Sequence, residues 1–207
     1  MPLPLSYGPV GLRPIRVRDW RDLQAVTAAN RSWLAPWEAS LPSPGVPVDI
    51  RGGIRILLSQ MRQGLGIPLV MEFEGRLVGQ LNVSSIQRGS ISSAMVGYWI
   101  AQEFAGRSIT PTAVALATDY MFRECGLHRV EICIRPENAA SLRVVDKLGF
   151  RFEGAHRGFL HIAGRWANHY EFALLSTDVA GGVLRRYVEG RVPADACVIP
   201  EWAASLL

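Results

Sequence analysis

The sequence predicts a mixed α/β (α+β) domain with a largely antiparallel, twisted sheet of about six or seven strands and about four helices. Three observations predict this class. A hairpin carries the turn dipeptide Glu74-Gly75, residues 93–135 read as strand, helix and strand, and a long closing hairpin turns near Ala163-Gly164. Hairpins pair their strands antiparallel, whereas the strand–helix–strand unit requires a crossover between parallel strands. The predicted element order is β-α-α-β-β-β-α-β-α-β-β.

The N-terminal part begins with a predicted short strand over residues 15–20. Asp19 is a suitable N-cap for a helix over residues 20–34, because its carboxylate can accept a hydrogen bond from the first turn. The apolar residues of this stretch recur at helical spacing, and Pro36 ends the helix.

A proline-rich loop follows over residues 39–48, and Asp49 can cap a second helix that runs through about Met61. Residues 66–86 then form the hairpin around Glu74-Gly75, where glycine supplies a positive φ.

The next strand is predicted over residues 92–101 and leads through a short loop into a helix. Thr110 fits the N-cap of this helix, Pro111 its first position and Gly126 the position just beyond its end. The strand over residues 127–136 alternates apolar and polar side chains, with Val130, Ile132 and Ile134 on one face.

Asn138 is predicted to cap a further helix, and residues 150–175 form the closing hairpin. We expect residues 1–177 to form one domain and residues 178–207 to be a C-terminal extension of unknown role. The apolar stripe of the capped helix consists of Leu142, Val145 and Leu148.

Composition favours a single globular domain: the chain has 207 residues, 49% of them hydrophobic and 19% charged. We find no apolar run of membrane-spanning length and no secretory signal, and expect a cytoplasmic location. Three widely spaced cysteines exclude a full disulfide framework and a cysteine-rich zinc module, and we expect no metal. The net charge is +4 without a dense basic run, so we expect no sequence-specific nucleic-acid binding.

The most informative segment is "YWIAQEFAGRSITPTA", where a strand passes through a loop of small residues into a helix. Free backbone N–H groups at such a helix start can bind phosphate, and Arg107 can add a charge-assisted contact. Glycine-containing junctions between loops and helices are common, so this feature alone does not establish a phosphate site.

Together with its surroundings, this segment resembles the GNAT acetyltransferases, and within them the RimJ and RimL type that acetylates the N-termini of ribosomal proteins. The resemblance covers roughly residues 10–176, and it depends on the order and spacing of several stretches. These are "NRSWLAPWE" at 30–38, "GRLVGQLNV" at 75–83, "VGYWIAQEFAGRSITPTA" at 96–113, "HRVEICIRPENAASLRVVDKLGFRFEG" at 128–154 and "GRWANHYEFAL" at 164–174.

The resemblance implies acetyl-CoA as the co-substrate. The pyrophosphate loop of the family, Q/R-x-x-G-x-G/A, falls on residues 105–110, with departures at Ala105, Ser108 and Thr110. Ser108 matters most, because glycine there tolerates any φ and allows phosphate to approach closely. The cofactor-binding residues implied are Gly106, Arg107, Ser108, Ile109 and Thr110 in the loop, the backbone of Tyr98, Trp99 and Ile100 along the pantetheine arm, and Asn138 near the thioester.

In RimL-type relatives, a serine three residues after the motif asparagine supplies a proton or hydrogen bond to the departing thiolate, and the matching residue here is Ser141. A serine at this position can also simply satisfy the helix end. On the acceptor side, Trp37 and Glu38 are the predicted substrate-binding residues. Trp33, Trp99 and Trp166 could line the same groove or pack in the core.

The sequence does not identify the general base. RimL-like enzymes place a glutamate on the penultimate strand, but that position is Leu160 in this chain. The candidates are Glu131, Glu103, Glu38 and His169, or the amine loses its proton to solvent through ordered water molecules.

Three functions compete. The first is acetyl transfer to a protein N-terminal amine, with Ala or Ser of a ribosomal or other protein as the acceptor. The second is acetylation of a small amine such as a polyamine, amino acid or aminoglycoside. The third is a catalytically weak module that binds acetyl-CoA. We expect a monomer or homodimer that does not bind a membrane.

Overall fold

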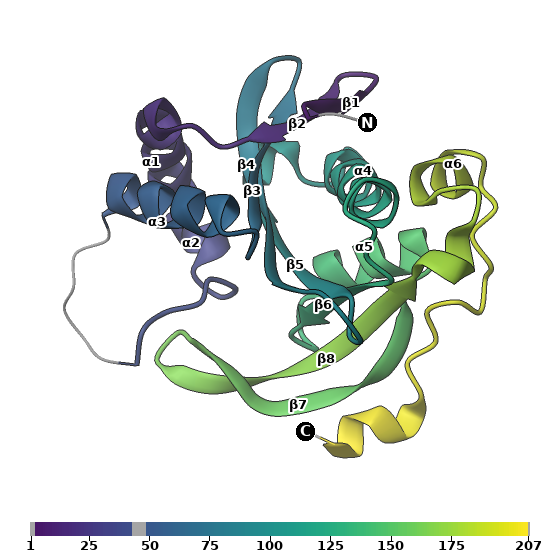
Figure 1. The fold of residues 1–207 in the computed structure, drawn as a ribbon. Helices are drawn as coiled ribbons and strands as arrows, with labels where there is room; N and C mark the ends of the chain where they lie inside the picture. Colours follow the sequence, from purple (N-terminus) through teal and green to yellow (C-terminus); the bar gives the residue numbers. More distant parts are fainter. Residues whose placement is uncertain (1–2, 43–48, 207) are drawn as a thin grey trace.

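The computed structural model describes residues 3–42 and 49–206, so residues 43–48 of the predicted proline-rich loop lie outside the described residues. An eight-stranded sheet forms the centre of the molecule, in the order β1-β2-β3-β4-β5-β6-β8-β7 (Figure 1). Among the described residues all neighbouring strands pair antiparallel except β5 and β6, which confirms the predicted class with one strand more than expected. The strands are β1 (Leu5–Tyr7), β2 (Val10–Pro14), β3 (Ile67–Phe73), β4 (Arg76–Gln87), β5 (Ser93–Ile100), β6 (Arg129–Ile134), β7 (Arg151–Ile162) and β8 (Arg165–Leu175).

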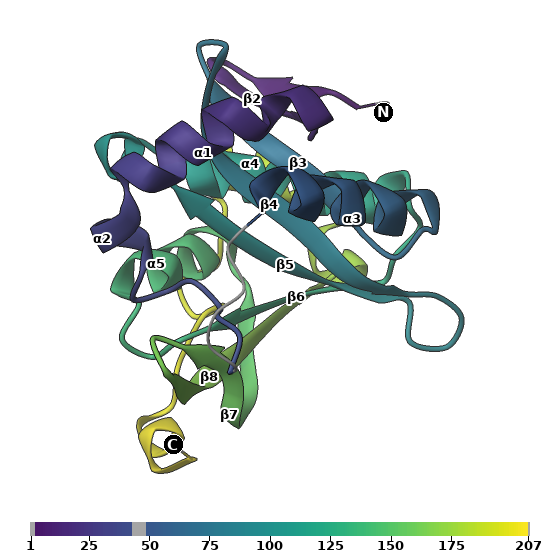
Figure 2. The same ribbon diagram turned by 90° about the vertical axis from the view of Figure 1, so that its left-hand side faces the viewer.

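Helices cover both faces of this sheet. The N-terminal helices lie on one face, and α4, α5 and α6 lie on the other (Figures 1 and 2). The larger apolar core lies beneath α4 and α5, and a smaller one lies beneath α1 and α3. The helices are α1 (Trp20–Ala29), α2 (Arg31–Leu34), α3 (Ile50–Arg62), α4 (Ile109–Arg123), α5 (Ala139–Leu148) and α6 (Val183–Val188).

The N-terminal prediction was wrong in two respects. Strands occur at β1 and β2, and not over residues 15–20, where a 3-10 turn spans Val17–Asp19. Asp19 does not cap α1 with its side chain. It is buried, accepts a 2.7 Å hydrogen bond from the Arg16 backbone and pairs with Arg13 at 2.8 Å. Burial alone would raise the pKa of Asp19, but these bonds and the Arg13 charge hold it below its usual range.

The helix predicted over residues 20–34 is broken at Asn30, which separates α1 from α2. The Asn30 side chain donates to the Val26 carbonyl at 2.9 Å and accepts from the Gln102 backbone at 2.8 Å. It therefore joins the end of α1 to the loop after β5.

Other local predictions are confirmed. Asp49 caps α3 by accepting a 2.8 Å hydrogen bond from the Gly52 backbone. The turn residues Glu74 and Gly75 have φ values of 51° and 78°, and the closing hairpin turns at Ala163 and Gly164 with φ values of 50° and 81°. These residues adopt the positive φ values that two-residue hairpin turns require.

β5 and β6 separate along their length. Their parallel pairing runs only from Ser93 opposite Arg129 to Met95 opposite Glu131, while β5 stays paired with β4 as far as Ile100. Over residues 96–100 the edge of β5 that faces β6 is therefore free of sheet pairing in the described structure.

The C-terminal residues pack on the domain. The two carboxylate oxygens of Asp119 on α4 accept hydrogen bonds from the Val183 and Leu184 backbone at 2.7 and 3.1 Å, which caps α6. Arg186 donates to the Leu148 carbonyl at the end of α5. A final 3-10 segment (Glu201–Leu206) lies against β7, as Figure 1 shows. Whether a domain boundary falls at residue 177 stays a prediction.

Within the described residues, no helix is long and apolar enough to span a membrane, and no group of three or more His, Cys, Asp or Glu side chains is arranged to hold a metal. All three cysteines are free.

Candidate active site

The first cavity, of about 340 Å³, lies where the end of β5 meets the starts of α4 and α5. Of the residues that the sequence assigned to the co-substrate, the structure brings all except Arg107 to its wall. They are Tyr98, Trp99, Ile100, Gly106, Ser108, Ile109, Thr110, Asn138 and Ser141.

The loop before α4 gives this cavity its free backbone donors. Gly106 and Ser108 have positive φ values of 78° and 60°, and the helix begins at Ile109 with Ser108 as N-cap. The predicted N-cap, Thr110, was therefore wrong by two residues. Pro111 occupies the third helical position, where its missing N–H would have been unpaired within the helix in any case. The N–H groups of the first turn thus lie at a helix start that favours anions.

Two cationic side chains line the first cavity, and neither was predicted from the sequence. The Arg107 guanidinium lies over the Phe104 ring, 5.5 Å from its centroid, and is not part of the wall. Arg143 and Lys147 on α5 do line the cavity. Their spacing of four residues places them on one helix face, which is the signal that could have identified them.

Asn138 and Ser141 occupy the start of α5 as their spacing predicted. The Asn138 side chain accepts a 3.1 Å hydrogen bond from the Ser141 backbone N–H, which confirms the cap. The Ser141 hydroxyl is not used in this cap, and the residue lines the cavity.

A second cavity, of about 180 Å³, adjoins the first and is lined by residues of both β5 and β6 beyond the point where their pairing ends. Four residues line both cavities: Trp37, Tyr98, Asn138 and Ser141. Tyr98 lies opposite Leu81 on the sheet face that packs against α4 and α5. Strand alternation places Gly97, Cys133 and His169 on the other face, so the second cavity reaches through the sheet.

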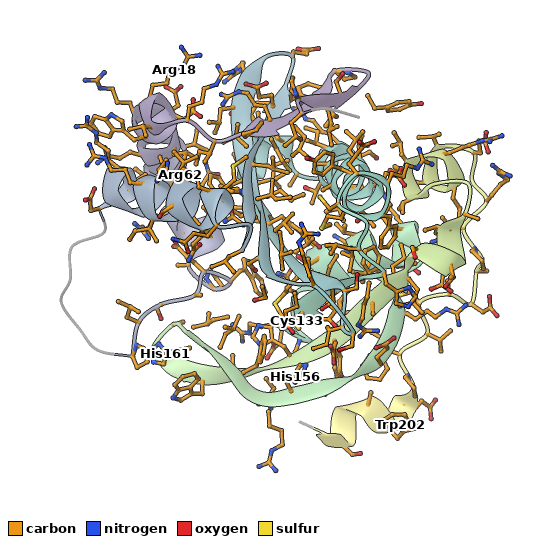
Figure 3. All side chains as sticks on the ribbon, in the orientation of Figure 1. Arg18, Arg62, Cys133, His156, His161 and Trp202 are labelled. Carbon is orange, nitrogen blue, oxygen red and sulfur yellow. The ribbon has the colours of Figure 1, made fainter. Side chains whose placement is uncertain are left out.

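Arg135 holds one wall of the second cavity. It donates to the Pro36 carbonyl at 2.7 Å and lies over the Trp37 ring, 5.6 Å from the ring centroid. Its side chain is 11% exposed and pairs with Glu137 at 3.3 Å. The loop after α2 also runs along the hairpin tip, where the Ser40 backbone donates to the His161 carbonyl at 2.8 Å (Figure 3).

The other sequence candidates lie in different places. Glu38 pairs with Arg31 at 3.1 Å, Glu103 with Arg76 at 3.8 Å, and neither lines a cavity described here. Glu131 is held with Glu153 by Arg129, outside both linings. The remaining tryptophans lie in two different environments. Trp33 and Trp99 line the first cavity, and the Trp33 indole donates to the Ile100 carbonyl at 3.0 Å. Trp166 is exposed and lies outside both cavities.

Of the base candidates from the sequence, only His169 lines the second cavity. Leu160, which stands where RimL-like enzymes have a glutamate, lines the same cavity. The imidazole is buried, and its Nδ1 lies 3.1 Å from the Ala167 carbonyl. A carbonyl oxygen only accepts hydrogen bonds, so Nδ1 carries the hydrogen and Nε2 holds the lone pair. Burial lowers the pKa of His169, and the Arg135 charge acts in the same direction. The ring is therefore neutral at pH 7.

Cys133 lies on the concave side of the β7–β8 hairpin, where it lines the second cavity (Figure 3). Burial, together with the charges of Glu171 and Glu131, raises the pKa of its thiol to about 12. The group that acts as a nucleophile is the thiolate, which is nearly absent at neutral pH with such a pKa. The site therefore offers no activated cysteine for an acyl intermediate.

Comparisons with known proteins agree on one family. Residues 10–151 match the model of the acetyltransferase (GNAT) domain. The probable N-acetyltransferase YjcK of Bacillus subtilis is 38% identical over 173 residues, covering 81% of this chain and 94% of that protein. The ribosomal protein uS5-alanine N-acetyltransferase of Escherichia coli is 31% identical over 175 residues, covering 83% and 90%.

Among solved structures, Mycobacterium smegmatis RimJ in complex with CoA-disulfide superposes with a TM-score of 0.81 at 32% identity, covering 87% of this chain and 88% of that one. The fold, the position of the loop cavity and these similarities all point to the same family. The chain belongs to the GNAT acetyltransferases, and it is an N-acetyltransferase that depends on acetyl-CoA.

Proposed function

We propose that this enzyme transfers the acetyl group of acetyl-CoA to the N-terminal amine of a protein that begins with Ala or Ser, with ribosomal proteins as the acceptor class. The observation that carries the proposal is that the first and second cavities share Trp37, Tyr98, Asn138 and Ser141. A donor held in the first cavity would therefore meet, at these residues, an amine that enters through the second.

The second cavity favours a chain terminus over a polyamine. Among the described residues its lining contains no Asp or Glu, and its one cation, Arg135, is already bonded. A polyamine or aminoglycoside carries several positive charges, which need carboxylates for binding. A small first residue suits a cavity of about 180 Å³. The name of the E. coli relative, a ribosomal-protein-alanine N-acetyltransferase, supports the same acceptor.

The chain's own groups supply the binding and the protons. The helix start at Ile109 and Thr110, with Arg143 and Lys147, would hold the phosphates of acetyl-CoA, while the free edge of β5 would pair with its pantetheine arm. Bound acetyl-CoA supplies an activated thioester. A backbone N–H at the end of β5 is the proposed donor to the oxyanion.

Proton handling is divided between the two sheet faces. His169, neutral in the second cavity, takes the proton of the attacking amine through Nε2. Ser141, at the junction of the cavities, donates a hydrogen bond to the departing thiolate. The amine nitrogen forms the C–N bond as the carbonyl π electrons move to oxygen, which gives the oxyanion, and the amine proton goes to His169. Collapse of the oxyanion then breaks the C–S bond, and the electron pair of that bond goes to sulfur.

A panel of acceptors tests the proposal, with release of CoA as the readout. Peptides that begin with Ala or Ser should release CoA, whereas spermidine and aminoglycosides should not. Peptides with a blocked N-terminus and an internal lysine are the matched control. Preferential turnover of the small amines would overturn the acceptor class. Binding of acetyl-CoA without turnover on any amine would favour the module that only binds acetyl-CoA.

The role of Ser141 has its own test. Ser141→Ala should lower kcat more than it lowers the affinity for acetyl-CoA, because the hydroxyl acts on the developing thiolate charge. Steady-state kinetics and calorimetry measure the two quantities. An unchanged kcat would remove Ser141 from the mechanism.

A further inference from the structure

The Tyr98 hydroxyl is buried without a regular hydrogen bond. Its Oη is shielded from solvent and has no partner of regular geometry among the described residues. Two arginine nitrogens share this condition, but Arg135 and Arg186 each donate through other nitrogens. Buried polar groups in proteins almost always have a partner. An unpaired hydroxyl inside a functional cavity therefore requires an explanation.

The position of Tyr98 supplies one. Its ring lies on the sheet face of α4 and α5, and the residue lines both cavities together with Ser141. Burial raises the pKa of Tyr98, and the neighbouring Ser141 hydroxyl acts in the opposite direction. Tyr98 therefore keeps its proton at every pH at which the enzyme works. It can donate a hydrogen bond but cannot serve as a base.

We infer that Tyr98 is a positioning residue for Ser141: its hydroxyl donates to Ser141 Oγ and so directs the Ser141 hydrogen toward the junction of the two cavities. This inference rests on the role of Ser141 in the proposed function. Because Oγ accepts one hydrogen bond, it becomes a stronger donor for the next. Two hydroxyls in series would thus stabilise a thiolate better than Ser141 alone. No proton is transferred from Tyr98, so the step balances without its ionisation.

The test uses the wild-type enzyme, Tyr98→Phe, Ser141→Ala and the double variant. With an Ala-initiated peptide as acceptor, Tyr98→Phe should lower kcat about threefold to tenfold, the effect of one hydrogen bond, and leave KM for acetyl-CoA unchanged. The double variant should be no slower than Ser141→Ala, because the tyrosine acts through the serine.

A binding measurement gives a readout that does not need turnover. The wild-type enzyme should bind CoA more tightly than desulfo-CoA, which lacks the sulfur. Tyr98→Phe and Ser141→Ala should narrow this preference by a similar factor and leave the affinity for desulfo-CoA unchanged. The melting temperature of Tyr98→Phe without ligand should change little, because the loss of one hydrogen bond is offset by the removal of a buried polar group.

The matched control is Tyr120→Phe, which removes the same atom from a half-buried tyrosine toward the far end of α4, outside both linings. Its kcat and CoA preference should equal those of the wild type. A full kcat in Tyr98→Phe while Ser141→Ala is slow would overturn this inference alone. So would additive losses in the double variant. A full kcat in Ser141→Ala would remove the proposed role of Ser141 and this inference together.

Discussion

Ser108 adopts a left-handed backbone conformation, with φ at 60°, where the loop enters α4. A residue with a Cβ pays about 1–2 kcal/mol for this conformation, whereas glycine adopts it freely. The glycine that the family has at this position thus matches the backbone that the structure requires. Serine retains the same geometry at a cost in stability.

Ser108→Gly should therefore raise the free energy of unfolding by about 0.5–1 kcal/mol, after the greater freedom of glycine in the unfolded chain is subtracted. Affinity for acetyl-CoA should be unchanged or tighter. Thermal denaturation with and without acetyl-CoA measures both. The matched control is Ser85→Gly, at an exposed serine with φ at 52°. It should raise the free energy of unfolding in the same way and leave the affinity for acetyl-CoA unchanged. A large loss of affinity in Ser108→Gly alone would make its hydroxyl a required ligand.

His169→Gln should lower kcat by about a hundredfold if the imidazole takes the amine proton. In the wild type, kcat should fall as the pH drops through the His169 pKa, which lies below its usual 6.5, because protonation removes the Nε2 lone pair. In the variant, the fall of kcat at low pH should be absent. The control is His128→Gln, which changes an exposed histidine outside both cavity linings. Its kcat should fall at low pH as in the wild type. An unchanged pH profile in His169→Gln would indicate proton loss to solvent.

The same pKa shift links stability to pH. The folded state keeps His169 neutral to a lower pH than the unfolded chain does, so below about 6.5 the unfolded chain binds the proton first. The contribution of neutral His169 to the free energy of unfolding is therefore fully present above pH 6.5, and it is lost as the pH falls through the pKa of His169 in the folded state. Denaturant titrations of the wild type and His169→Gln at pH 7 and pH 5 should show a smaller pH dependence in the variant.

At the scale of elements, the separation of β5 from β6 depends on how β5 lies against β4. Gly79 faces Ile100 across this pair, and a Cβ at residue 79 would lie 2.3 Å from the Trp99 carbonyl oxygen. That atom belongs to the backbone and cannot rotate away. Glycine at this position lets the end of β5 approach β4 and keeps its other edge available to the first cavity.

Gly79→Ala should displace the end of β5, lower the free energy of unfolding by about 1–3 kcal/mol and weaken acetyl-CoA binding. Chemical denaturation and calorimetry test the two effects. Gly154→Ala on β7 is the control, because no atom lies within 4 Å of its added Cβ. Normal acetyl-CoA affinity in Gly79→Ala would separate the geometry of β5 from co-substrate binding.

At the scale of the whole molecule, the C-terminal residues complete the core on the α4 and α5 face. Val179 and Val183 are buried there, at 7% and 0% exposure, and Asp119 caps the helix that carries Val183. Burial of each valine contributes about 1.5–3 kcal/mol. Val179 and Val183 thus bury apolar surface against the part of the structure that holds the first cavity.

Truncation after residue 177 should lower the free energy of unfolding by about 3 kcal/mol or more, measured by denaturant titration. Truncation after Pro200 retains α6 and serves as the milder control. Asp119→Ala in the full chain should cost about 1 kcal/mol by leaving the α6 start uncapped. Equal stability of the 177-residue form and the full chain would show that the extension is dispensable for the fold.

The sequence determined several local features of this protein, because hairpin turns, caps and strand alternation depend on neighbouring residues, although the caps predicted at Asp19 and Thr110 were wrong. Glu74-Gly75, Asp49, Asn138 and the alternating β6 were all predicted on that basis. The order of these motifs also indicated the family, and the spacing of Asn138 and Ser141 placed both at one helix start.

The tertiary structure alone decided which distant residues meet. Asn30 accepts a hydrogen bond from Gln102, Asp19 pairs with Arg13, and Trp37 lies against Arg135. The sequence named His169 as one of four base candidates, but only the structure places it in the second cavity, where Tyr98 and Ser141 also contribute to the lining. The physical reason is that burial, charge and an unpaired hydroxyl are properties of an assembled environment, which local sequence patterns do not encode.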